Sequence, residues 1–260
     1  MQSEAIYHTA QALEQALQSA RPITRLTARH EDMSVDDAYA IQRILIEGRL
    51  RDGVRVVGRK IGLTSRAAQQ MLKVDEPDFG VLLSDMALPS GASIRRASLI
   101  APKAEGEIAF VMRRDLRGPG VTAADVLSAT EGVMTCFEIV DSRIENWDIR
   151  LQDTVADNAS SALFVLGDRL VDPRGIDLAL AGMVLEKNGE VVLTGAGAAA
   201  LGSPVNAVAW LANTLGRYGE GLRAGDVVLS GSLAAMVPVA VGDYLRVTIG
   251  GIGSCSVRFE

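Results

Sequence analysis

Residues 182–195, "GMVLEKNGEVVLTG", constrain the fold more than any other stretch of the chain. Two strand-like runs flank Asn188 and Gly189. This dipeptide favours a type I′ turn, because both central residues of that turn have positive φ. The stretch therefore predicts a β-hairpin, and the chain must contain at least one antiparallel pair of strands.

Further strands are predicted wherever β-branched residues are bounded by glycine turns. These segments are residues 54–64, 104–112, 133–140, 226–232, 243–250 and 254–260. Residues 76–80, "EPDFG", are predicted as a turn because they contain Pro77 and Gly80. Most of the chain beyond residue 53 is thus predicted to be rich in β-structure.

Helices are predicted in four places. Apolar residues recur at helical spacing over residues 6–20, and "SVDD" gives Ser34 the pattern of a capping box at the start of a second helix. Thr122 begins a short helix, and Ser203 with Pro204 begins a longer one. We therefore predict an α+β fold, with a helical N-terminal arm over residues 1–53 and a β-rich domain over residues 54–260.

Composition excludes several classes of protein. The formal net charge of the 260 residues is −6, which argues against nucleic acid or an anionic membrane as partner. No stretch approaches the roughly 18 apolar residues of a membrane span, and the N-terminus lacks the pattern of a secretory signal. Cys136 and Cys255 are far apart, with no CxxC motif or nearby histidine. These features predict a cytoplasmic protein whose cysteines are reduced core residues.

Two glutamates in "PKAEGEIAF" present the central question about function. Alternate residues of a strand point to the same face, so Glu105 and Glu107 project together while Gly106 takes the other face. The side chains could lie on a solvated edge, where charged residues are common. They could instead bind a divalent cation, which converts the repulsion of two carboxylates into attraction.

A third glutamate favours the cation site. Glu138 lies between Phe137 and Ile139 in a predicted strand, on the same face as Cys136 and Val140. That face is apolar, and a carboxylate placed there needs a partner. Three carboxylates with water or substrate at the remaining positions suit Mg²⁺ or Mn²⁺. The shortage of histidine and the lack of a cysteine cluster argue against zinc.

Other candidates stay open on the sequence alone. Lys60 in "GRKIGLTS" could be a surface lysine or a cation that meets an anionic substrate. Asp78 is interpreted from the sequence alone as an ordinary residue of the predicted turn at residues 76–80. Residues 153–161, "DTVADNASS", could be a polar loop or a loop that lines a substrate site. The glycines of residues 195–202 do not fit a dinucleotide-binding motif, because their spacing is wrong and they follow a hairpin.

Taken together, the motifs resemble those of the 2-keto-4-pentenoate hydratases, a family within the fumarylacetoacetase superfamily. The segments that carry the resemblance are "GRKIGLTS", "VDEPDFGVLLSDM", "AEGEIAF", "FEIVDSRIENW", "DTVADNASS", "GAGAAALGSPVNAVAWLAN" and "GIGSCSVRF". The resemblance begins near residue 29 and continues to the C-terminus. The related 4-oxalocrotonate decarboxylases share most of these motifs.

The resemblance implies a fold and a set of site residues. The fold is a mixed β-sheet roll with a helical N-terminal part. Glu105, Glu107 and Glu138 match the positions that bind Mg²⁺ or Mn²⁺ in the family. Lys60 and Asp78 match catalytic positions of the family. Ser160 and Ser232 match its substrate-binding positions.

The resemblance also implies an activity, which is metal-dependent hydration of 2-hydroxypenta-2,4-dienoate to 4-hydroxy-2-oxopentanoate in the meta-cleavage catabolism of aromatic compounds. Protonation at C5 would precede addition of water at C4, with Lys60 and Asp78 serving the proton transfers. One alternative is decarboxylation of 2-oxo-3-hexenedioate, and another is a non-catalytic assembly subunit of a hydratase–decarboxylase complex. Family members resemble homo-oligomers, and some hydratases pair with a related decarboxylase.

Overall fold

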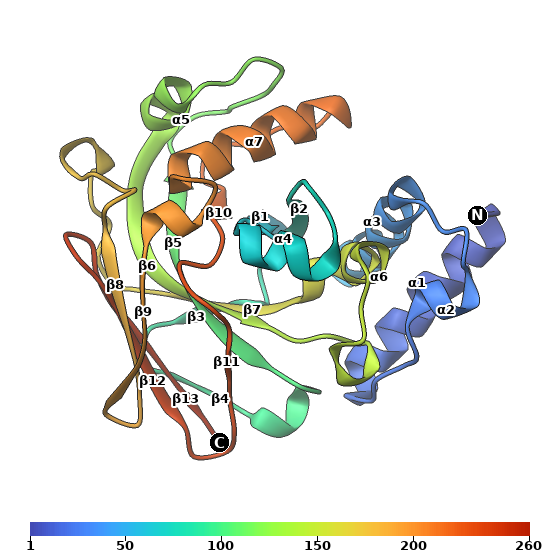
Figure 1. Ribbon diagram of the computed structural model, residues 1–260. Helices are drawn as coiled ribbons and strands as arrows, with labels where there is room; N and C mark the ends of the chain where they lie inside the picture. Colours follow the sequence, from blue (N-terminus) through green and yellow to red (C-terminus); the bar gives the residue numbers. More distant parts are fainter.

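The predicted hairpin is present and belongs to a five-stranded sheet. The computed structural model describes all 260 residues. Asn188 and Gly189 have φ values of 56° and 86°, as a type I′ turn requires. The order of the strands is β4-β13-β12-β8-β9 (Figure 1). They are β4 (Ala92–Ile94), β8 (Gly182–Lys187), β9 (Glu190–Ala196), β12 (Tyr244–Ile249) and β13 (Gly253–Phe259).

The second sheet has eight strands, in the order β2-β1-β10-β5-β6-β7-β3, with β11 paired to β5. Its bounds are β1 (Val56–Gly62), β2 (Asp78–Leu83), β3 (Ala87–Pro89), β5 (Lys103–Met112), β6 (Thr130–Val140), β7 (Ser161–Leu166), β10 (Val227–Leu229) and β11 (Val237–Pro238). The longest strands, β5 and β6, pair antiparallel along almost their whole length. Together the two sheets form the mixed roll that the sequence resemblance implies.

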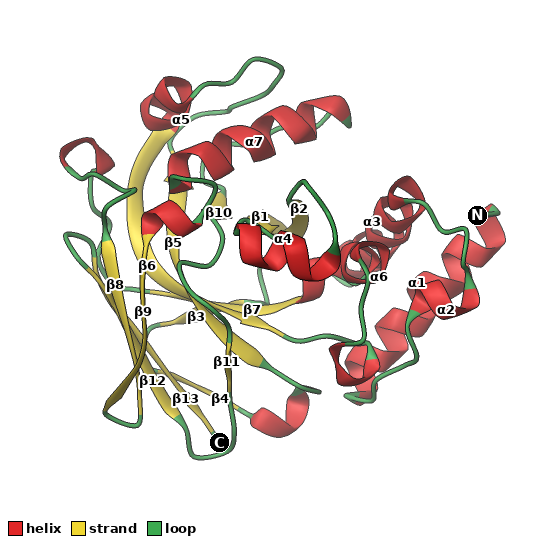
Figure 2. Cartoon of the chain, in the orientation of Figure 1, coloured by secondary structure: helices red, strands yellow, loops and turns green.

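The main core lies between the two sheets and beneath helix α7 (Pro204–Arg217), which crosses the top of the roll in Figure 2. Phe110 and Phe137 are fully buried there. Burial of each ring stabilises the fold by about 1.5–3 kcal/mol. Gly106 allows the sheets to meet closely, because a Cβ atom at this position would lie 2.5 Å from Sδ of Met183 and 2.9 Å from Cγ2 of Val247.

The N-terminal helices form a second, smaller core, seen on the right in Figure 1. Helix α3 begins with the predicted capping box, in which the Ser34 hydroxyl and the Asp37 carboxylate each accept a backbone N–H of the other residue. The helices at residues 26–29 and 35–51 pack against the helix at residues 151–156, so the N-terminal part is joined to the site region. The helices of the small core are α1 (Ser3–Ser19), α2 (Leu26–Arg29), α3 (Val35–Arg51) and α6 (Leu151–Ala156).

Shorter helices complete the chain. They are α4 (Arg66–Leu72), α5 (Ala123–Ala129), and the 3₁₀ turns η1 (Arg96–Ser98), η2 (Glu145–Trp147), η3 (Asn158–Ser160), η4 (Pro173–Gly175) and η5 (Gly197–Ala199). None of the helices combines the length and the apolar character needed to cross a lipid bilayer.

Two local predictions were wrong. The strand β2 begins at Asp78, within the segment predicted as a turn, because this segment pairs with β1. The polar stretch predicted as a loop from residue 153 begins inside helix α6. The carboxylate of Asp153 explains the helix, since it accepts the backbone N–H groups of Arg150 and Thr27 and the Thr27 hydroxyl. The contact with Thr27 spans 126 residues and has no local signal in the sequence.

Candidate active site

Three glutamates meet on one face of the β5–β6 pair. Glu105 and Glu138 are direct partners in the antiparallel register, and Glu107 lies two residues further along the same face of β5. One carboxylate oxygen from each residue lies within 4.8 Å of the other two. A Cβ atom at Gly106 would meet Met183 and Val247 of the core between the sheets, so Gly106 lies on the opposite face of β5 from Glu105 and Glu107, which confirms the predicted alternation.

Burial leaves these carboxylates short of partners. Glu107 and Glu138 are fully buried, and Glu105 is half-buried. The backbone N–H of Gly231 donates to Oε2 of Glu107 at 2.8 Å. Oε1 of Glu107 and both carboxylate oxygens of Glu138 have no hydrogen bond. Buried carboxylates in this state are costly, and a divalent cation with oxygen ligands would satisfy all three. The donor set therefore fits Mg²⁺ or Mn²⁺.

The pKa values of the glutamates reflect this crowding. Burial, followed by the charge of Glu138, raises the pKa of Glu105 to about 7. The pKa of Glu107 rises well above its ordinary value for the same two reasons. Three carboxylates at this separation cannot all be ionised without a compensating positive charge. The cluster is thus arranged for a cation.

Lys60 supplies one positive charge from the neighbouring part of the sheet. Its Nζ lies 3.3 Å from Oε2 of Glu138, and its side chain is only 4% exposed. Burial alone would lower the pKa of Lys60, but the nearby carboxylates, Glu138 foremost, hold it above the ordinary value. The ammonium group therefore stays protonated beside the glutamates.

Asp78 lies opposite Gly62 in the β1–β2 pair, near Lys60. It is 2% exposed, its Oδ1 atom has no hydrogen-bond partner, and burial raises its pKa while Lys60 opposes the rise. A Cβ atom at position 62 would overlap Oδ1 of Asp78 and lie 3.3 Å from Nζ of Lys60. Only glycine at position 62 leaves room for this carboxyl group.

The two predicted serines are placed differently. Ser160 is buried, and its hydroxyl lies 3.1 Å from the hydroxyl of Thr154. Ser232 is half-buried, and its hydroxyl donates to the backbone oxygen of Ala234 at 2.7 Å. Neither hydroxyl forms a hydrogen bond with the glutamates. Ser232 adjoins the cluster through its neighbour Gly231, whose N–H binds Glu107.

Some site residues were missed from the sequence. Gly231 has a φ of 100°, and a Cβ atom there would overlap the side chain of Thr64, which is buried. The position of this glycine between two serines in "SGS" is the sequence feature that could have indicated Gly231 as a site residue. Gly62 lies within the predicted strand over residues 54–64, and its contact with Asp78 depends on how two strands pair, which has no local signal in the sequence.

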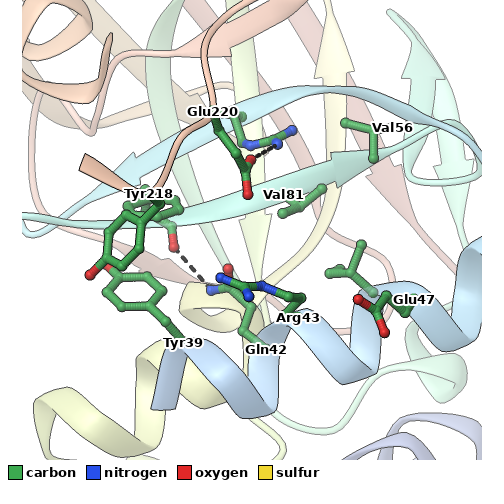
Figure 3. Close-up of a pocket in the computed structure, with 11 residues that line it drawn as sticks. Tyr39, Gln42, Arg43, Glu47, Val56, Val81, Tyr218 and Glu220 are labelled. Atoms are coloured by element: carbon green, nitrogen blue, oxygen red, sulfur yellow. Dashed lines mark hydrogen bonds and ion pairs between the residues drawn. The ribbon is translucent and has the colours of Figure 1, made fainter. Parts of the chain in front are cut away.

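A cavity of about 100 Å³ opens on the other face of the β1–β2 pair (Figure 3). Tyr39, Phe79 and Tyr218 gather at one end, and Arg59 donates to Glu220 at 2.8 Å. Arg59 and Phe79 alternate along their strands with the site residues of β1 and β2. This cavity is therefore separated from the carboxylate cluster by the sheet.

The chain matches a known family. The family model for fumarylacetoacetate (FAA) hydrolase, C-terminal, matches residues 53–260. A 2-hydroxyhexa-2,4-dienoate hydratase of Comamonas testosteroni is 53% identical over 251 residues, which cover 96% of this chain and 95% of the relative. A 2-hydroxypent-2,4-dienoate hydratase of Pseudomonas putida is 59% identical over 208 residues, covering 80% of this chain and 94% of the relative.

Among solved structures, the 4-oxalocrotonate decarboxylase of Pseudomonas putida G7, complexed with magnesium and adipate, superimposes with a TM-score of 0.97. The two sequences are 39% identical, and the alignment covers all of this chain and 99% of the decarboxylase. The whole fold, including the N-terminal helices, is therefore shared with that protein.

Proposed function

Because this chain belongs to the fumarylacetoacetate hydrolase family, we propose that it is a metal-dependent hydro-lyase that hydrates 2-hydroxypenta-2,4-dienoate to 4-hydroxy-2-oxopentanoate. The curated relatives described above are hydratases of short 2-hydroxydienoates. The single observation that carries the proposal is that Oε1 of Glu107 and Oε1 of Glu138, both buried without a partner, converge beside the buried ion pair between Lys60 and Oε2 of Glu138.

The metal site is formed by Glu105, Glu107 and Glu138. When these residues hold Mg²⁺ or Mn²⁺, the cation acts as a Lewis acid that offsets negative charge on the oxygens of the substrate. Gly231 fixes the orientation of Glu107 through its N–H. The two sheet strands that carry the glutamates are continuously paired, which holds the three carboxylates at fixed separations.

Lys60 and Asp78 perform the remaining chemistry in this proposal. The ammonium group of Lys60 binds the anionic carboxylate and C2 oxygen of the substrate. Asp78, whose pKa is raised by burial, can hold a proton and exchange it with carbon or water. The C2 hydroxyl loses its proton as C5 gains one. A water molecule then adds across the C3–C4 double bond. Its hydroxide bonds to C4, and its remaining proton passes to C3.

Decarboxylation of 2-oxo-3-hexenedioate is the second candidate, favoured by the similarity to the solved decarboxylase. The two reactions are separated by giving purified protein the monocarboxylate dienol and the dicarboxylate in parallel. We expect loss of dienol absorbance with formation of 4-hydroxy-2-oxopentanoate, and little CO₂ from the dicarboxylate. Rapid CO₂ release with slow hydration would reverse the assignment.

We also propose a division at residue 53 into an N-terminal helical arm and a catalytic domain over residues 54–260. The limits of the family match support it.

We further propose that the chain assembles into a homo-oligomer, forms a complex with a related decarboxylase, and is located in the cytoplasm. A non-catalytic role in such a complex is disfavoured by the intact charged cluster. Size-exclusion chromatography with light scattering tests the oligomer directly.

A further inference from the structure

The side chain of Asn158 binds both backbone groups of one residue in β2. Its Oδ1 accepts the N–H of Val81 at 2.7 Å, and its Nδ2 donates to the carbonyl oxygen of Val81 at 2.9 Å. Asn158 is 5% exposed. The amide thus provides the donor and acceptor that a neighbouring strand would otherwise supply.

Strand β2 needs such a partner, because it is the end strand in the order of the eight-stranded sheet. Gly80 allows the approach, since a Cβ atom there would lie 2.6 Å from the backbone oxygen of Asn158. A second buried amide, that of Gln42, donates to the backbone oxygen of Phe79 at 3.1 Å. The backbone that follows Asp78 is therefore held by side chains from outside the sheet.

The turn that carries Asn158 is unusual and firmly held. Asn158, Ala159 and Ser160 all have φ between 51° and 53°, a region that non-glycine residues rarely occupy. The preceding residue, Asp157, forms a buried ion pair with Arg143 and also accepts the backbone N–H of Arg143 at 2.9 Å. A left-handed turn kept in place by a buried ion pair indicates that the surrounding structure determines it.

Asp78 depends on this arrangement because it is the first residue of β2, the strand that Asn158 holds at Val81. The location of its carboxyl group beside Lys60 and Gly62 therefore follows from the position of the β2 backbone. We propose that Asn158 is a positioning residue, whose amide fixes β2 at Val81 and so places Asp78 for proton transfer. This inference rests on the hydratase function proposed above.

The chain contains a matched control. Asn213 in α7 binds Val121 in the same way, with Oδ1 accepting the N–H and Nδ2 donating to the carbonyl oxygen, both at 2.9 Å. Val121 precedes α5 and contributes nothing to the carboxylate cluster. Substitution of Asn213 therefore removes an equivalent pair of hydrogen bonds away from the site.

The test compares Asn158→Asp with Asn213→Asp, and Asn158→Ala with Asn213→Ala should the charged variants not fold. Aspartate keeps the acceptor but loses the donor to Val81. We expect Asn158→Asp to lower kcat by about ten- to a hundredfold, as misplacement of a catalytic group does. KM should change by less than about threefold, because Lys60 and the glutamates stay in place. Asn213→Asp should keep the kcat of the wild type.

Amide hydrogen exchange measures the same contact without turnover. The Val81 amide of the wild-type protein should be protected, and its exchange should be faster in the Asn158 variants than in the Asn213 variants. An exposed Val81 amide in the wild type, or equal kcat losses in the two sets of variants, would overturn the inference. Absence of hydratase turnover in the wild type would overturn the proposed function and with it the role of Asn158 in proton transfer, while faster exchange at Val81 in the Asn158 variants would still show that the amide holds β2.

Discussion

Replacing Glu138 by glutamine is expected to lower kcat/KM by on the order of a thousandfold. The substitution keeps the size of the side chain but removes the charge that faces both Glu105 and Lys60. Added Mg²⁺ should raise the Tm of the wild-type protein, as any ligand of the folded state does, and should not raise that of Glu138→Gln. Steady-state kinetics and thermal unfolding, each with and without Mg²⁺, measure the two effects.

Glu131→Gln is the matched control, because Glu131 lies on the same strand but is exposed. Its substitution should change the free energy of unfolding by less than about 0.5 kcal/mol and leave turnover unchanged. Full turnover by Glu138→Gln that is insensitive to EDTA would mean that these glutamates do not hold a catalytic metal.

Lys60→Met is expected to remove activity while leaving metal binding intact. The buried carboxylates lose the positive charge that Nζ places 3.3 Å from Glu138. Removing one partner of a buried ion pair costs about 3–5 kcal/mol of unfolding free energy, so the metal-free variant should be much less stable than the wild type. Mg²⁺ should restore much of that loss, since it neutralises the same carboxylates.

The comparison with Lys73→Met controls for the loss of a lysine, because Lys73 is exposed. Urea unfolding with and without Mg²⁺ measures stability, and dienol loss measures turnover. If Lys60→Met retained wild-type turnover, the lysine would have no part in binding or protonating the substrate. Loss of Mg²⁺-induced stabilisation would instead place Lys60 among the structural supports of the metal site.

Strand periodicity was sufficient to place two of the three clustered glutamates together. The alternation of residues put Glu105 and Glu107 on one face, and the structure confirms it. The direct pairing of Glu105 with Glu138 was beyond prediction from spacing, because register depends on how two distant strands align. The approach of Lys60 to Glu138 depends in the same way on the order of strands in the sheet.

Local signals were reliable where the chain interacts with itself over a few residues. The hairpin at Asn188, the capping box at Ser34 and the start of a helix at Thr122 are of this kind, and all three are confirmed. Helix α6 and the turn at Asn158 were not predicted, because the contacts that stabilise them are distant in sequence. Asp153 binds Thr27, and Asn158 binds Val81, 77 residues away.

We propose that this chain hydrates a 2-hydroxydienoate with the help of a divalent cation held by three glutamates. The most direct measurement follows the loss of 2-hydroxypenta-2,4-dienoate by purified protein after treatment with EDTA, during titration with Mg²⁺ or Mn²⁺, with the product identified. We expect negligible turnover without metal, saturable recovery on titration, and 4-hydroxy-2-oxopentanoate as the product. Equal rates with and without metal would mean that hydration does not use a divalent cation, and a different product would mean that the chain is not this hydratase.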